Sequence, residues 1–99
     1  MPTQNVIVSV VGGVTSVDIP AARISVLGQD EVVWHTHLDE PFAVSFPGGG
    51  PFASVLFVGK KGKPVHSGAA VIPAVGLDYK YVVQVLGAAA LDPVVHTDP

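Results

Sequence analysis

Short apolar segments alternate with polar, glycine-containing or proline-containing turns along the whole chain. Residues 31–37 are predicted to form a β-strand, in which successive side chains point to opposite faces with a period of two. Val32 and Trp34 therefore fall on one face of this strand, and His35 and His37 fall on the other. We expect Trp34 to lie in the core between two sheets.

The spacing of the turn residues predicts an all-β protein. Eleven glycines and nine prolines divide the 99 residues into segments of about ten, which is the rhythm of a sandwich or barrel. Only residues 87–91 have a helix-forming composition, and one turn of helix is not stable alone. We predict a single domain over residues 1–99, a β-sandwich of seven to nine strands. The candidate strands are residues 5–11, 15–19, 23–27, 31–37, 42–46, 52–58, 65–72, 78–86 and 94–97.

Composition narrows the functions that this domain could have. Apolar residues make up 48% of the chain and charged residues only 13%, about half the usual share, so disorder is excluded. The formal net charge of −3 argues against a nucleic-acid partner, because binding a phosphate backbone requires a basic surface. The one basic cluster, Lys60, Lys61 and Lys63, is interpreted as a solvated hairpin tip that discourages pairing between sheet edges.

The termini and the cysteine count bear on localisation. Residues 1–13 have neither the basic region nor the continuous apolar stretch of a signal peptide, and no apolar run is long enough to span a bilayer. As written, the sequence predicts a cytoplasmic protein without a membrane span; if it begins inside a longer chain, export is the alternative. The absence of cysteine excludes disulfides and thiolate metal ligands and leaves the redox compartment open.

Several short motifs between Arg23 and the C-terminus resemble the cupredoxin-like family. An acidic turn at Asp30 precedes a strand with an aromatic residue, and a polar turn then leads through Pro41 into the next strand. The pair Tyr79-x-Tyr81 is similar to the strand that precedes the copper loop in that family. The order of these motifs implies a cupredoxin-like Greek-key β-sandwich.

The ligands that copper-binding members of that family use are missing. Phe42 stands where the resemblance places the first histidine, and Val83 stands where it places the cysteine. Residues 84–87 contain neither histidine nor methionine, and the one methionine of the chain is Met1. A blue-copper centre needs a thiolate and two imidazoles, so electron transfer through such a centre is excluded. The resemblance therefore implies a copper-free fold, and a fold does not define a function.

These absences favour a non-catalytic role. We expect a copper-free cupredoxin-like domain without a cofactor that acts as a binding or self-assembly module, with a protein or a second copy of the chain as partner. A small domain with so few charges either has an unusually large core or covers part of its surface with a partner. No serine lies in the glycine-flanked elbow of a nucleophile, so no catalytic residue is predicted.

The pair His35 and His37 supports an alternative function. Two imidazoles at positions i and i+2 of a strand point to the same side and suit zinc, copper or nickel. Glu40 could complete such a site, and His66 or His96 could add ligands from neighbouring strands. The alternative is a divalent-metal-binding β-protein, either cupin-like or a small metalloenzyme.

A cupin-like pattern of glycine, two histidines, glutamate and glycine runs through this segment, at Gly28, His35, His37, Glu40 and Gly48. Each interval differs by one residue from the usual cupin pattern, and the second cupin motif is missing. A shift of one residue moves a strand side chain to the opposite face, which weakens the cupin interpretation. The simplest interpretation is that both histidines are outward polar positions of a sandwich strand.

Overall fold

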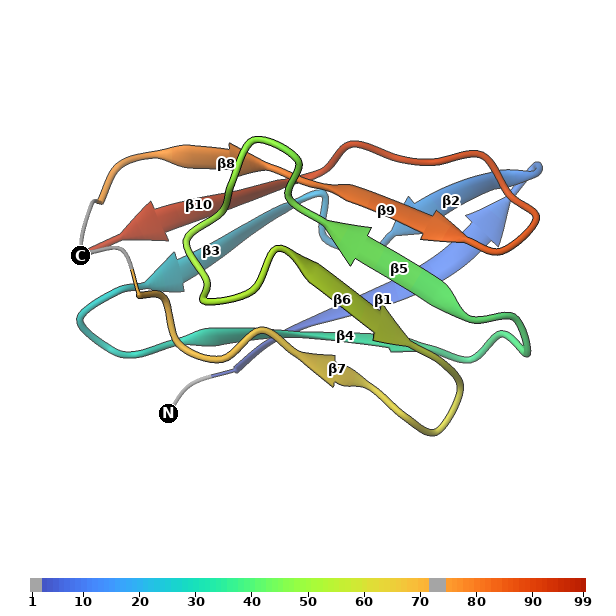
Figure 1. Cartoon of the computed structure of the whole chain (residues 1–99), viewed down its shortest axis with the longest axis horizontal. Coiled ribbons are helices and arrows are strands. Elements are labelled where there is room, and N and C mark those ends of the chain that lie inside the picture. The colour runs from blue at the N-terminus through green and yellow to red at the C-terminus, as the bar shows by residue number, and fades with distance from the viewer. Residues whose placement is uncertain (1–2, 72–74) are drawn as a thin grey trace.

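The computed structural model describes residues 3–71 and 75–99, and these contain ten β-strands in three sheets and no helix (Figure 1). The all-β prediction is therefore confirmed. In the same residues, no helix is long and apolar enough to cross a membrane. The strands are β1 (Thr3–Val11), β2 (Val14–Val17), β3 (Ala21–Ser25), β4 (Glu31–Thr36), β5 (Phe42–Ser45), β6 (Leu56–Gly59), β7 (Val65–His66), β8 (Asp78–Lys80), β9 (Val82–Val85) and β10 (Val94–Asp98).

The sheets are arranged as a four-stranded sheet in the order β2-β1-β4-β7 and two three-stranded sheets, β3-β10-β8 and β6-β5-β9. Strands β8 and β9 follow one another along the chain, so the two smaller sheets adjoin (Figure 1). Most neighbouring strands are antiparallel, but β1 pairs with β4 and β3 pairs with β10 in parallel. This arrangement is consistent with a β-sandwich, because the apolar core draws residues from the four-stranded sheet and from both smaller ones.

The core is centred on Trp34, which is fully buried on β4. Its ring centroid lies 5.5 Å from that of Phe57 and 5.6 Å from that of Tyr81, within the range of favourable aromatic pairs. Val32 belongs to the same cluster, whereas His35 lies on the opposite face of β4, half-exposed. The predicted burial of Trp34 and the predicted two faces of this strand are therefore confirmed.

Residues 78–86 are the main departure from the predicted strands. They form two strands that belong to different sheets, because β8 pairs with β10 whereas β9 pairs with β5. Tyr81 lies at the break, where its N–H donates to the Pro93 carbonyl (3.0 Å). This division raises the count to ten, above the predicted seven to nine. Of the four alternating residues Tyr79, Tyr81, Val83 and Val85, the last three are buried and Tyr79 is half-buried.

Two other predicted strands are shorter than expected. Residues 52–55 join no sheet, although Phe52 is buried, with its ring centroid 5.8 Å from that of Phe46. Strand β7 ends at His66, shortly before Gly68, whose positive φ of 72° turns the chain away. The predicted end of that strand, Ile72, lies outside the described residues.

The buried hydroxyl of Tyr81 leads to a prediction about alkaline stability. The Trp34 indole N–H donates to this oxygen (3.3 Å), and burial raises the pKa of Tyr81 to about 12 from 10.0. Because the folded protein holds this proton more tightly than the unfolded chain, stability present below pH 10 should be lost as the pH rises toward 12. The expected loss is roughly 2–3 kcal/mol.

The titration can be isolated in a Tyr79→Phe variant, in which Tyr81 is the only tyrosine left. Its tyrosinate absorbance should rise near pH 12 while the protein remains folded. A midpoint at or below pH 10 in the folded variant would contradict the burial of this hydroxyl.

Candidate functional site

Phe42 and Val83, the positions that the resemblance assigns to copper ligands, are both buried. Their exposed fractions are 1% and 0%, and neither offers a metal-binding atom. Phe42 lies on β5, where its cross-strand partners are Gly59 on β6 and Val85 on β9. A Cβ atom at Gly59 would lie 2.6 Å from Cζ of Phe42, so the aromatic ring uses the space that glycine leaves. This end of the β6-β5-β9 sheet is filled with hydrocarbon.

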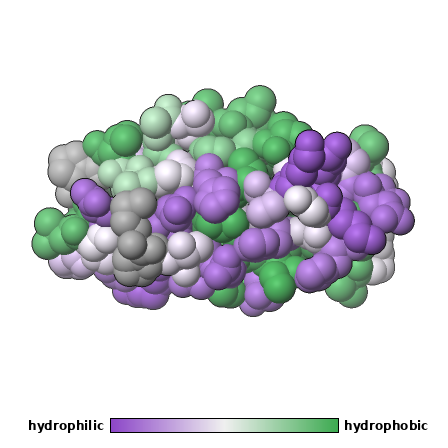
Figure 2. All heavy atoms as spheres, turned by 90° about the horizontal axis from the view of Figure 1, so that it is seen from below, coloured by the Kyte–Doolittle hydropathy of each residue, from purple (hydrophilic) through white to green (hydrophobic). Residues whose placement is uncertain are grey.

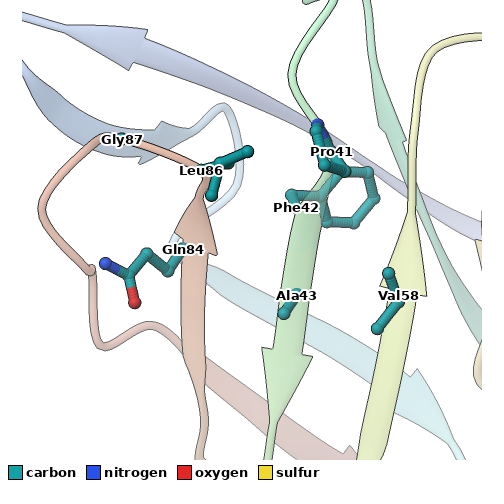
Figure 3. A pocket seen from close by; sticks show the side chains of 7 residues that line it. All are labelled: Pro41, Phe42, Ala43, Val58, Gln84, Leu86 and Gly87. Atoms are coloured by element: carbon teal, nitrogen blue, oxygen red, sulfur yellow. The ribbon is translucent and has the colours of Figure 1, made fainter.

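An open recess of about 310 Å³ lies over this end (Figure 3). Figure 3 shows Pro41 and Leu86 at the ends of β5 and β9, with Ala43, Val58 and Gln84 on the three strands below. Leu86 is 68% exposed, which is high for a leucine next to a recess. The lining residues are Pro41, Phe42, Ala43, Val58, Gln84, Leu86 and Gly87.

The recess opens onto a face of the sheet that carries no charged residue. The outward positions of β6, β5 and β9 form two cross-strand rows, because the pairing aligns them in register. We call this surface the uncharged sheet face. Its residues are Val58, Ala43 and Gln84 in one row and Leu56, Ser45 and Val82 in the other.

His35 and His37, the predicted metal ligands, line a second hollow together. It has a volume of about 270 Å³ and lies between the end of β4 and the turn that joins β6 to β7. Nε2 of His35 is 2.8 Å from Oδ1 of Asn5 on β1, so this ring nitrogen donates to the amide oxygen. We call this hollow the basic groove. It is lined by His35, Thr36, His37, Lys60, Lys61, Gly62 and Pro64.

The other predicted ligands do not join this histidine pair. Glu40 lines a different recess, beside Leu86. His66 on β7 lies 3.2 Å from a carboxylate oxygen of Glu31. His96 is on β10, where its two ring nitrogens face Asp78 and Asp98. Over residues 3–71 and 75–99, no three histidine, aspartate or glutamate residues are grouped so as to hold a metal ion.

The basic groove also contains two lysines that sequence reasoning assigned to a solvated turn. Three of the five basic residues of the chain lie at positions 60–63, and this clustering was the available signal. The sequence could not show which other segment of the chain lies beside these lysines. The β6–β7 turn brings Lys60 and Lys61 against the end of β4, because β7 pairs with β4.

Comparisons with protein-family models, with characterised proteins and with solved structures found no match to this chain. What it does is therefore inferred from its own surfaces. Two of them differ sharply in chemistry: the uncharged sheet face and the basic groove.

Proposed function

We propose that this chain is a non-catalytic, copper-free cupredoxin-like domain that acts as a self-assembly module. In this proposal its partner is a second copy of the chain, bound through the uncharged sheet face. The observation that carries the proposal is that six neighbouring outward positions on three strands hold no charge.

The strand pairing supports the cupredoxin-like Greek-key arrangement. Because β1 and β4 are parallel neighbours, the chain between them must leave the four-stranded sheet, and it does so through β3. The chain leaves the four-stranded sheet again between β4 and β5 and returns to it between β6 and β7. Repeated crossing between sheets is typical of Greek-key sandwiches. The burial of Phe42 and Val83 supports the copper-free part of the proposal.

The exposure of the apolar side chains supports assembly. Leu56 is 60% exposed and Val58 is 64% exposed, and both lie on β6, the edge strand of the β6-β5-β9 sheet. Figure 2 shows hydrophobic residues gathered along the upper border of the view, while hydrophilic residues dominate its lower part and right side. Neighbouring apolar groups gain free energy when they leave water together.

The lack of charge favours a second copy as the partner. A two-fold axis brings the same patch of both subunits together, so any charge near the axis would face its own copy. The uncharged sheet face avoids this repulsion, whereas the outer side of the β3-β10-β8 sheet carries Arg23, Asp98 and Asp78. A charged partner would find no ion pair to form on the uncharged sheet face.

The size of the face predicts a weak dimer. Three strands of four residues make a surface of roughly 14 by 13 Å, or about 200 Å², at the usual strand spacing and rise. Pro41 and Leu86 extend it, but it remains below the roughly 800 Å² per partner of a standard interface. We expect self-association with a dissociation constant on the order of 0.1–1 mM.

Sedimentation equilibrium over a range of protein concentrations tests the proposal. The average mass should rise from that of the monomer toward twice that value as the concentration approaches 1 mM. A Val58→Lys variant should remain monomeric, because it places an ammonium group on the otherwise uncharged sheet face of each subunit.

The matched control is Leu27→Lys, a substitution at a leucine that is 82% exposed in the turn after β3. This variant should associate like the parent chain. The proposal is wrong if the parent chain stays monomeric at 1 mM, or if Val58→Lys and Leu27→Lys associate equally.

A further inference from the structure

We infer that the basic groove binds a small molecule carrying two or more oxyanion charges, such as a phosphate ester or a polycarboxylate. This inference is independent of the self-assembly proposal, because the groove shares no residue with the uncharged sheet face. It also departs from the metal site predicted for the same two histidines.

The charge of the groove lining carries the inference. Two lysines, Lys60 and Lys61, are among the residues that line the groove, and no carboxylate residue is. In the described part of the chain, the one carboxylate within ion-pair distance of these lysines is that of Asp39, 3.6 Å from Nζ of Lys61. The Asp39 side chain is 91% exposed, so this pair is screened by water and neutralises the groove only weakly.

The turn that carries the lysines is held in a fixed shape. The Lys60 N–H donates to the Lys63 carbonyl (3.2 Å), and the Lys63 N–H donates to the Lys60 carbonyl (2.9 Å). Gly62 adopts a φ of +75°, which allows the chain to reverse within two residues. A ligand therefore meets two cations whose backbone positions are already set, which reduces the ordering cost of binding.

Two histidines, His35 and His37, also line the groove. Nε2 of His35 is held by Asn5 at 2.8 Å, which orients the ring on β4. His37 is exposed immediately after the same strand and can donate a ring N–H to an anion. A divalent cation at these imidazoles would lie beside two ammonium groups without a neutralising carboxylate in the lining, which is unfavourable.

The dimensions of the groove limit the ligand. A volume of about 270 Å³ lies just below the usual range for small-molecule sites, which starts at about 300 Å³, so only a compact ligand fits. One compact group with several oxyanion oxygens can reach both lysines there. In a chain with a net charge of −3, this concentration of positive charge would attract such an anion locally, although the whole protein repels it.

Titration with pyrophosphate, followed by amide chemical shifts at constant ionic strength, tests the inference. Saturable shifts should appear at residues 35–37 and 60–63 and leave the β3-β10-β8 sheet unchanged. Citrate in a parallel titration distinguishes a phosphate ligand from a carboxylate ligand, since both carry the required charge. The double variant Lys60→Gln/Lys61→Gln should weaken binding at least tenfold.

Lys63→Gln is the matched control, because it removes one charge from the same turn at a residue that does not line the groove. It should change the affinity less than threefold. The inference is overturned if shifts fail to saturate by 20 mM for both anions, or if the control weakens binding as much as the double variant. It is also overturned if zinc alone binds stoichiometrically at His35 and His37.

Discussion

Replacing Phe42 with alanine is expected to lower the free energy of unfolding by about 3–5 kcal/mol. Phe42 is 1% exposed and belongs to the apolar core cluster, so removal of its ring leaves a cavity in addition to the lost burial. The ring packs over Gly59, and a glycine has no side chain that could move into the space left by the ring. Urea unfolding followed by the fluorescence of Trp34, the only tryptophan, measures the loss.

Two further variants complete this test. Leu86→Ala changes a leucine that is 68% exposed in the same recess, and it should alter stability by no more than about 0.5 kcal/mol. Phe42→Leu retains much of the apolar volume and should cost less than Phe42→Ala. A loss below about 1 kcal/mol for Phe42→Ala would show that this end of the sheet is not a packed core.

Replacing Gly59 with alanine is expected to cost about 1–3 kcal/mol, because the added methyl group overpacks the same contact. Its Cβ atom would lie 2.6 Å from Cζ of Phe42 and 3.3 Å from the Lys63 carbonyl oxygen. The ring is enclosed by the core and the carbonyl belongs to the tight turn, so neither moves freely. The loss should appear in the same urea unfolding experiment.

A double-mutant cycle tests whether contact with the Phe42 ring causes the loss of stability in Gly59→Ala. In a Phe42→Leu background, Gly59→Ala should cost at least about 1 kcal/mol less than in the parent chain, since the shorter side chain leaves room for the methyl group. The control is Gly48→Ala, where a Cβ atom meets nothing within 4 Å and φ is not positive. That variant should be neutral or slightly stabilising. Equal costs of Gly59→Ala in both backgrounds would contradict contact with Phe42.

The contact between Phe42 and Gly59 also joins the two surfaces on which the functional proposals rest. Phe42 lies at the base of the recess beside the uncharged sheet face, and Gly59 immediately precedes Lys60 in the basic groove. A methyl group at Gly59 that displaces the turn should therefore weaken anion binding as well as stability. Leu86→Ala, in contrast, leaves the turn untouched.

Local alternation was sufficient to predict the all-β class and the inward faces. Trp34 is buried and His35 is half-exposed as the period of two indicates, since successive side chains of any strand point to opposite sides. That neither Phe42 nor Val83 has a metal-binding side chain is a property of residue type alone. These features need no knowledge of which strands are neighbours.

The strand boundaries and the basic groove depend on pairing between strands that are distant in the sequence. The break at Tyr81 arises because β8 pairs with β10 and β9 pairs with β5, and no local pattern specifies those partners. The basic groove likewise exists only because β7 pairs with β4, which brings Lys61 beside His35 from 26 positions away in the chain. Hydrogen bonds between remote segments, rather than the periodicity of any one segment, bring these charges together.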